Sequence, residues 1–465
     1  MDMKRLAAIA AALILVSGCG AGERIRGLNP FSGPETDDPN APDQSERISV
    51  LELEEQLSAE GGGEPLILPR SYVNTAWPQP DGYPTHAMQH TGASGDLERV
   101  WRADIGRGSS NDRRINARPV IAGGVVYAID ATGRVTAHAL SDGEERWSAR
   151  LQGDEREGQG GGFIPFIGGR GDAVLTFGGG LAWDAGRLYA HSGGKFIVAL
   201  DAASGEELWR QTALTPFHSA PTVSDARVYV TTDDNELLAL DAGSGEVLWT
   251  HRSITETARL ITAPSPAVLG DTVIAPFTSG EVVALRAPNG TVLWSDSLTR
   301  TGGLTPLSTI NDIAASPVIL GDSVYAMSHS GIMAAFDLRS GERSWTLPAG
   351  GLHAPYVAGD FLFIVTTDGE VAAIDRSEGR VRWITDLPAF VNERRRRNRI
   401  SWAGPVLAGD RLVLASSEGQ LVILDPATGE RIGERDLGDP VFIAPVIAEE
   451  TLVVLTDDGR LIALR

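Results

Sequence analysis

The chain has 465 residues and a formal net charge of −21, which argues against sequence-independent binding to nucleic acid and against attraction to anionic lipid. Its 54 glycines and 26 prolines separate short apolar runs rich in Val, Leu and Ala, a mixture typical of an all-β fold. Cys19 is the only cysteine, which excludes an intramolecular disulfide and a cysteine-based metal site.

The N-terminus has the organisation of an export signal. Lys4 and Arg5 precede an apolar stretch, residues 6–16, that is too short for a comfortable transmembrane helix, and two small residues then precede Cys19. This pattern resembles a bacterial lipoprotein signal, in which the peptide is removed before the cysteine and the thiol is acylated. We therefore predict a signal peptide over residues 1–18 and a lipid anchor on Cys19. An ordinary secretory signal with an incidental cysteine is the alternative.

From Cys19 to residue 96 the sequence predicts a flexible linker that contains one short helix. Residues 20–47 are rich in Pro, Asp, Ser and Gly and have too few apolar groups to offset the entropy of ordering the chain. In SERISVLELEEQL, residues 45–57, a potential N-cap precedes apolar residues on one helical face, so we expect the helix there. Whether this helix docks on the rest of the protein is left open by the sequence.

From about residue 97 onward the chain repeats one unit. ALDAASGEELW (199–209) returns as ALDAGSGEVLW (239–249), ALRAPNGTVLW (284–294), AFDLRSGERSW (335–345) and AIDRSEGRVRW (373–383). Each unit follows a proline-led strand and a turn. Alternation in segments such as RVYVTT and ELLALD is the period-2 pattern of β-strands. This succession of four strands is typical of one blade of a β-propeller.

The ends of the chain indicate how the ring closes. The first outer strand, ERVWRAD, has no inner strands before it, whereas the last three inner strands have no outer strand after them. We therefore predict an all-β fold over residues 97–465, an eight-bladed β-propeller of four-stranded antiparallel blades closed by pairing the N-terminal strand with the C-terminal blade. An outer strand at residues 429–437 has Gly433 where the others have tryptophan. The tryptophans expected to fill the wedges between blades are Trp101, Trp147, Trp209, Trp249, Trp294, Trp345 and Trp383.

The repeated unit resembles that of pyrroloquinoline-quinone-type β-propellers. With the lipoprotein signal and the eight blades, the chain resembles the BamB family of outer-membrane β-barrel assembly lipoproteins. In that family an arginine before one blade's opening strand and an acidic residue in the next such loop help to bind BamA. Arg259, in TARLITAP, matches the arginine, and Asp312, in NDIAASP, matches the first acidic position. Leu260 substitutes in a shifted position for a leucine of the motif, and the second acidic position falls on Ala314, so the match is partial.

The resemblance implies a non-catalytic scaffold without a cofactor. Such a protein is anchored in the outer membrane by its lipid, faces the periplasm, and binds BamA and other subunits of the β-barrel assembly complex. It assists the insertion of outer-membrane proteins, and exposed strand edges offer a way to guide unfolded clients. Both candidate loops join an outer strand to the next blade's first strand, so we expect Arg259, Leu260 and Asp312 on one rim. A scaffold lipoprotein of another envelope complex is an alternative.

A quinone-dependent dehydrogenase is the enzymatic alternative, since such enzymes share this propeller. The adjacent cysteines of those enzymes are missing here, because the single cysteine lies in the signal. His86 and His90 are four residues apart, but they lie in a Pro/Gly-flanked loop without a third ligand, so we predict no metal site.

Two further segments stand out. The glycine-rich segment 158–182 lacks the lysine and the strand–loop–helix context of a phosphate loop, and we interpret it as an excursion between blades. The arginines 394–397 form the one basic cluster of the acidic chain. A solvated loop is the simplest interpretation of that cluster, and attraction to acidic headgroups or to a partner's acidic patch is the other.

Overall fold

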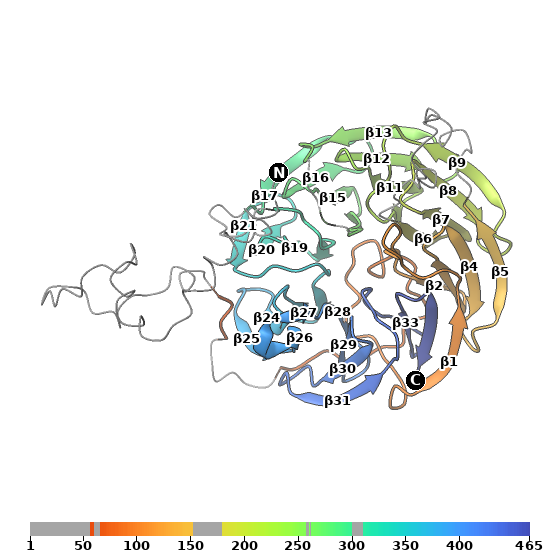
Figure 1. The fold of residues 1–465 in the computed structure, drawn as a ribbon. Helices are drawn as coiled ribbons and strands as arrows, with labels where there is room; N and C mark the ends of the chain where they lie inside the picture. The colour runs from red at the N-terminus through yellow and green to blue at the C-terminus, as the bar shows by residue number, and fades with distance from the viewer. Residues whose placement is uncertain (1–55, 60–65, 152–178, 257–259, 261, 300–309) are drawn as a thin grey trace, which may run out of the picture. The chain divides into compact units, whose positions relative to one another are not determined.

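The structure is a computed structural model that describes residues 56–59, 66–151, 179–256, 260, 262–299 and 310–465. These residues confirm the predicted fold, because they form eight four-stranded antiparallel sheets arranged as the blades of a propeller (Figure 1). In each blade the strands follow one another from the axis outward. Across the described ranges, no helix has the length and apolarity needed to cross a membrane.

The first four blades follow one another along the chain. From the innermost to the outermost strand, the first blade contains β2 (Val120–Ala122), β3 (Val125–Ile129), β4 (Arg134–Ala139) and β5 (Glu145–Arg150), and the second contains β6 (Gly180–Asp184), β7 (Arg187–His191), β8 (Phe196–Asp201) and β9 (Glu207–Thr212). The third blade contains β10 (Thr222–Ser224), β11 (Arg227–Thr231), β12 (Glu236–Asp241) and β13 (Val247–Arg252), and the fourth contains β14 (Ala267–Leu269), β15 (Thr272–Pro276), β16 (Glu281–Arg286) and β17 (Val292–Ser297).

The remaining blades include the one that joins the two ends of the chain. In the same order, the fifth blade contains β18 (Val318–Leu320), β19 (Ser323–Met327), β20 (Met333–Asp337) and β21 (Arg343–Leu347), and the sixth contains β22 (Tyr356–Ala358), β23 (Phe361–Val365), β24 (Glu370–Asp375) and β25 (Val381–Asp386). The seventh blade contains β28 (Trp402–Leu407), β29 (Leu412–Ser416), β30 (Gln420–Leu424) and β31 (Arg431–Asp436), and the closing blade contains β32 (Val446–Ala448), β33 (Thr451–Leu455), β34 (Arg460–Leu464) and β1 (Arg99–Asp104). A separate hairpin, β26 (Phe390–Asn392) and β27 (Arg397–Arg399), lies between the sixth and seventh blades in the chain.

The closing blade is built from both ends of the chain, as the sequence predicts. Strand β1 pairs antiparallel with β34, with Trp101 opposite Ala463 and Asp104 opposite Arg460. The backbone N–H of Glu98 donates to the carbonyl of Arg465 (2.7 Å), and the N–H of Arg465 donates to the carbonyl of Glu98 (2.9 Å). This pairing gives the last inner strand its missing neighbour, so no free sheet end remains at the seam.

Burial along the strands follows from their place in a blade. In β12 the four central residues are all buried, whereas the outer strand β13 alternates between exposed and half-buried residues. The inner strands are covered on both faces by neighbouring blades, which explains their nearly continuous apolar sequences. The core therefore lies between the blades, and each blade depends on its two neighbours.

Seven of the eight joints between blades use the repeated tryptophan in one way. The Nε1–H of Trp249, for example, donates to the carbonyl of Ala287 in the next blade (2.8 Å), and its ring covers Gly290. A Cβ atom at Gly290 would lie 2.5 Å from the ring, and the φ of +69° also favours glycine. The tryptophan and glycine pairs are Trp101–Gly143, Trp147–Gly205, Trp209–Gly245, Trp249–Gly290, Trp294–Gly341, Trp345–Gly379 and Trp383–Gly429.

The eighth joint, between the seventh blade and the closing blade, exchanges the large and the small residue. Gly433 stands at the tryptophan position of β31. Leu97 stands four residues before Trp101, where the other blades have their turn glycine. Leu97 is fully buried and has the left-handed φ of 57° that its glycine counterparts also have. Nearby, the Nη2 of Arg435 donates to the carbonyl of Asp96 (2.7 Å).

Residues 72–92 differ from the flexible linker that the sequence predicts for 19–96. They form a closed loop, which we call the axial belt: the N–H of Tyr72 donates to the carbonyl of His90 (2.9 Å), and the N–H of Gly92 donates to the carbonyl of Tyr72 (2.7 Å). Within this loop Trp77 and Met88 are almost completely buried. Figure 1 shows this part of the chain, in orange-brown, inside the ring of blades.

The axial belt bonds to the innermost part of every blade in ring order. Each contact pairs a backbone group of the innermost strand, or of the turn that follows that strand, with a backbone or side-chain atom of the belt. These hydrogen bonds are the physical reason that the belt is ordered. The contacts are Asn74 with Glu449 of the closing blade, Trp77 with Ile121, Pro78 with Trp183, Gln79 with Val223, Pro84 with Val268, Thr85 with Ile319, Gln89 with Gly359 and Thr91 with Gly409.

Two other sequence expectations concern segments that lie only partly within the described residues. Most of the helix expected at 45–57 lies outside the described residues, but Gln56 and Leu57 have no helical structure, and Leu57 is buried in the core between the fifth and sixth blades. The glycine-rich excursion expected at 158–182 ends in β6, which begins at Gly180. A Cβ atom at Gly180 would lie 2.4 Å from the Cα of Ala220, so close packing of strands explains this glycine. Residues 152–178 lie outside the described ranges.

Candidate partner-binding site

On one side of the ring, each outer strand ends and the innermost strand of the next blade begins. We call this side the crossover rim. Four antiparallel strands bring the chain back to the side from which it started, so each connection to the next blade begins and ends on this side. The loops that contain Leu260 and Asp312 are two neighbouring connections of this kind, as the sequence predicts.

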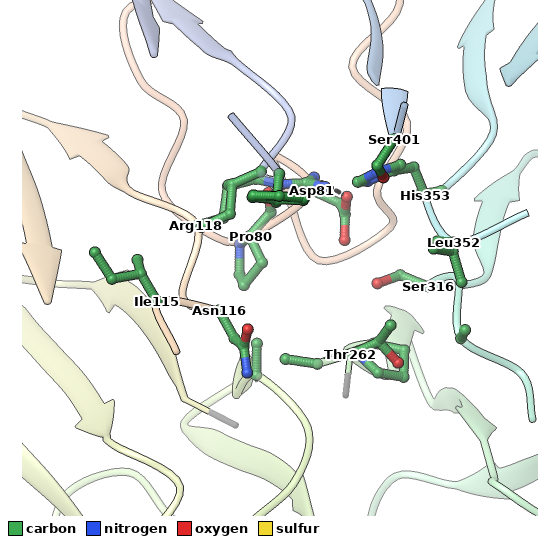
Figure 2. Close-up of a pocket in the computed structure, with 17 residues that line it drawn as sticks. Pro80, Asp81, Ile115, Asn116, Arg118, Thr262, Ser316, Leu352, His353 and Ser401 are labelled. Atoms are coloured by element: carbon green, nitrogen blue, oxygen red, sulfur yellow. Dashed lines mark hydrogen bonds and ion pairs between the residues drawn. The ribbon is translucent and has the colours of Figure 1, made fainter. Parts of the chain in front are cut away.

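The crossover rim opens at the ring axis into a cavity of about 190 Å³ (Figure 2). Seven crossover connections contribute to its wall, and the axial belt contributes Pro80 and Asp81. The other lining residues are Ile115, Asn116, Arg118, Ala220, Thr262, Ala263, Pro264, Ala314, Ser316, Leu352, His353, Ala354, Ser401, Phe442 and Ile443.

A buried ion pair lies in the wall of this cavity. The Nη1 of Arg118 donates to the carboxylate of Asp81 and to the carbonyl of Pro80 (2.9 Å). Burial raises the pKa of Asp81, but the charge of Arg118 and hydrogen bonds from Ser316 and Arg118 outweigh it, so the pKa lies below its ordinary value. Asp81 is therefore ionised at neutral pH and ties the axial belt to the first blade.

Two histidine side chains near the axis, His353 and His191, are neutral at neutral pH. Burial, and then the charge of Arg118, lowers the pKa of His353 to about 4. Burial also lowers the pKa of His191 to about 4, and its ring bonds the carbonyl of Ser219 (2.7 Å) and the N–H of Gly193 (3.2 Å). These groups add polarity to the axis without adding positive charge at neutral pH.

His86 and His90 hold the axial belt in place. His86 bonds the carbonyl of Pro317 through Nδ1 (2.6 Å) and the hydroxyl of Ser265 through Nε2 (3.2 Å). His90 bonds the carbonyls of Pro69 (2.6 Å) and Gly409 (2.7 Å). Both rings are thus occupied by the protein itself. Among the described residues there is no group of three or more His, Cys, Asp or Glu side chains placed to hold a metal ion.

Two of the three predicted partner-binding residues meet on the crossover rim. The N–H of Leu260 donates to Oδ2 of Asp312 (2.9 Å), which links the two neighbouring loops. Asp312 is fully buried, and the N–H of His329 in the next blade donates to its carbonyl (2.9 Å). In this arrangement the carboxylate of Asp312 positions the Leu260 loop. Arg259 lies outside the described residues, and the partner-binding role of the three residues stays a prediction.

The residue at the second acidic position is also buried. Ala314 is 2% exposed and lines the axial cavity beside Ser316. The two loops therefore continue from the Leu260–Asp312 bond to the mouth of the cavity, where Thr262 and Pro264 lie. The sequence motif predicts the proximity of the loops, but it contains no signal for the burial of Asp312 or for the axial cavity.

A ring of eight blades with this repeat, closed by a terminal strand, defines a pyrroloquinoline-quinone-type β-propeller. The family model described as outer membrane protein assembly factor BamB matches residues 89–164, 159–385 and 392–465. The chain belongs to the BamB family.

Individual relatives agree with this assignment. The outer membrane protein assembly factor BamB of Salmonella typhimurium is 30% identical over 367 residues, which cover 78% of this chain and 88% of that protein. The crystal structure of BamB from Moraxella catarrhalis has a TM-score of 0.64 at 19% identity and covers 80% of this chain and all of that chain. A europium-containing methanol dehydrogenase has a TM-score of 0.63 at 13% identity, over 84% of this chain and 89% of the enzyme. At these low identities the two structural likenesses show the fold alone.

Proposed function

We propose that this protein is a non-catalytic scaffold lipoprotein of the outer-membrane β-barrel assembly machinery. It is anchored in the outer membrane through Cys19, faces the periplasm, and binds BamA through the crossover rim, together with other subunits of the complex. In this role it assists the insertion of outer-membrane proteins. Membership of the BamB family over most of the chain is the observation that carries the proposal.

The geometry of the rim supports a role in binding rather than in chemistry. The hydrogen bond between Leu260 and Asp312 fixes one loop against the next, so a partner meets a preorganised surface and less loop entropy is lost on binding. Asp312 acts from beneath this surface, whereas Leu260 is only half-buried and is available to a partner. We assign direct contact to Arg259 and Leu260 and positioning to Asp312.

Affinity capture tests the proposal. The full-length tagged lipoprotein is purified from native membranes in detergent, and the proteins that accompany it are identified by mass spectrometry. Recovery of BamA is the expected result. Arg259→Glu should reduce that recovery while leaving the melting temperature unchanged, and Arg252→Glu, an exposed arginine on β13, is the matched control. Recovery of a different envelope complex without BamA would contradict the proposal.

A quinone-dependent dehydrogenase is the second candidate, because the fold is shared with methanol dehydrogenase. The axial cavity does not fit a tricyclic quinone: its volume of about 190 Å³ is below the roughly 300–1,000 Å³ of ordinary ligand pockets, and the axial belt enters its wall. Absorbance of a bound quinone in the purified protein would favour the dehydrogenase.

A further inference from the structure

The hairpin β26–β27 concentrates positive charge in an otherwise acidic protein. Residues 390–399 contain five arginines and one glutamate, whereas the whole chain has a formal net charge of −21. Arg394 to Arg397 are all exposed, and within the described residues no carboxylate lies at ion-pair distance from any of them. The four guanidinium groups are therefore exposed and without an ion pair in the part of the chain that the structure describes, so an external anion can reach them.

The hairpin is held in a fixed shape by its own polar groups. Its single acidic residue, Glu393, accepts hydrogen bonds from the N–H groups of Ala389 and Phe390 (both 2.9 Å), so this carboxylate is used inside the hairpin. The side chain of Asn392 accepts from the N–H of Arg395 (3.0 Å), and Arg396 adopts the left-handed conformation at φ 47°. This network presents the arginines at a tight turn instead of on a loose loop.

The base of the hairpin is attached to the sixth blade. Arg399 donates to the carboxylate of Asp368 (3.0 Å) and to the carbonyl of Thr367, in the turn between β23 and β24. The guanidinium groups of Arg399 and Arg396 lie 5.7 and 5.4 Å from the centre of the Phe390 ring, at distances typical of cation–π contacts. Binding at the tip therefore requires little reorganisation of the hairpin.

The hairpin also stands on the crossover rim. It is inserted in the connection from β25 to β28, and Ser401 of the same connection lines the axial cavity. The hairpin therefore lies in a connection that reaches the axial cavity, on the side where we propose that a partner binds. Arginine suits carboxylates in particular, because its planar guanidinium donates two parallel hydrogen bonds to one carboxylate.

We propose that Arg394, Arg395, Arg396 and Arg397 form a docking site for an acidic, extended polypeptide segment of a protein bound at the crossover rim. A short extended acidic segment touches only the hairpin, whereas an anionic membrane surface is broad and would also meet the acidic body around it. The overall charge of −21 therefore favours a peptide over a lipid surface. The site is independent of which protein supplies the segment.

Fluorescence anisotropy with a labelled oligoglutamate peptide tests this site in the full-length protein in neutral detergent. The test variant changes Arg394, Arg395, Arg396 and Arg397 to serine and keeps Arg399, which fixes the hairpin to the blade. We expect the variant to bind the peptide at least about tenfold more weakly than the wild type, because four exposed ion pairs are lost. Raised salt should weaken the binding of the wild type in the same direction.

A matched control removes the same charge from the outer strands of other blades. It changes the exposed arginines Arg99, Arg146, Arg150 and Arg252 to serine. Unchanged peptide binding by this control, with an unchanged melting temperature of the hairpin variant, supports the site. Equal weakening by both variants would mean that only overall charge matters, and it would overturn the proposal.

The lipid alternative has its own probe in the same experiment. A soluble short-chain phosphatidylglycerol is titrated in place of the peptide. If this lipid binds in a manner that depends on the four arginines and the peptide does not bind, the hairpin recognises headgroups and the proposal fails. Because the probe is a peptide alone, the result does not depend on whether BamA is captured.

Discussion

Seven joints of the ring have a large residue on the outer strand and a small one in the turn of the next blade, whereas the eighth joint has the small residue on the outer strand and the large one at the turn position. In seven joints a tryptophan on the outer strand covers a turn glycine of the next blade and donates to a carbonyl there. In the eighth joint the outer strand has Gly433, and the buried Leu97 stands at the turn position. The difference coincides with the seam where the two chain ends meet.

The physical reason lies in the covalent chain. In an ordinary blade, the third and fourth strands are joined by a tight turn whose glycine accommodates the ring. The closing blade has no such connection, because β34 ends at Leu464 and β1 begins at Arg99. Leu97 supplies bulk from the incoming strand to the core that also contains Ile423, and Gly433 lies against Ile423, so a Cβ there would be only 3.3 Å from that side chain. The repeated joint is thus a property of the turn as much as of the tryptophan.

The largest expected effect is the loss of one ordinary joint. Trp294 is 8% exposed, stacks on Phe336 with ring centres 5.6 Å apart, and donates to the carbonyl of Leu338 (2.8 Å). Trp294→Ala should lower the free energy of unfolding by about 3–5 kcal/mol, because it leaves a cavity and an unpaired carbonyl. Denaturant unfolding measures the change. An unchanged midpoint would mean that the ring does not depend on this joint.

The exchange of residues at the eighth joint can be tested by reversing it. Gly433→Trp alone should destabilise the protein by about 1–3 kcal/mol, since it adds a large ring to a site where Leu97 already supplies bulk. Leu97→Gly alone should cost about 2–4 kcal/mol through lost burial. The double variant should be more stable than the sum of the two changes implies. Strict additivity of the unfolding free energies would contradict compensation between these positions.

Arg435 should contribute less than either residue of the exchange. Its Nη2 donates to the carbonyl of Asp96 (2.7 Å), and its Nε lies 3.4 Å from the carboxylate of Glu98, but the arginine is partly exposed. Arg435→Ala should therefore cost about 1 kcal/mol or less in unfolding free energy. Arg431→Ala, on the same strand, is a control that leaves the seam intact. Equal effects of the two substitutions on the unfolding free energy would contradict a stabilising role of Arg435 at the seam.

The smallest effect concerns acid. In one ordinary joint the turn residue Asp241 has a lowered pKa, because the N–H of Ser244 and then its hydroxyl bond the carboxylate. A carboxyl group with a lowered folded-state pKa stabilises the protein above its ordinary pKa of about 4, and this contribution is lost as pH falls below that value. Asp241→Asn should flatten the decline of the melting temperature between about pH 4 and pH 2. An equally steep decline would exclude this cause.

Much of the ring was predictable because its signals are local and repeated. The period-2 strands, the turn glycines and the tryptophans recur in each unit, and the unmatched strands at the two ends specify the closing blade. The glycine at position 433 is visible in the sequence, but its reason is not, since Leu97 compensates only after the ends of the chain meet. Register with a distant partner is a tertiary property.

The axial belt could not be predicted from the same signals. Its residues show no apolar periodicity, and their glycines, prolines and polar residues are as typical of a flexible loop as of an ordered one. Side chains of the belt, such as Gln79, bond backbone groups, here those of Val223. Because every residue has these backbone groups, the sequence contains no signal for such a contact. Asp312 gives a related lesson at the candidate site: aspartates in loops are mostly exposed, so its burial depends on neighbours that only the fold assembles.

The axial belt has a mechanical consequence under the proposed anchor at Cys19, which would hold the protein by its N-terminus. Tension applied at that end reaches residues 72–92 before it reaches β1, and the belt is bonded to all eight blades. The load is therefore shared by many hydrogen bonds in parallel, whereas a pull on β1 alone would peel the closing seam one bond at a time. The seam is the place where the ring lacks a covalent link, and the belt shields it from the direction in which a tether pulls.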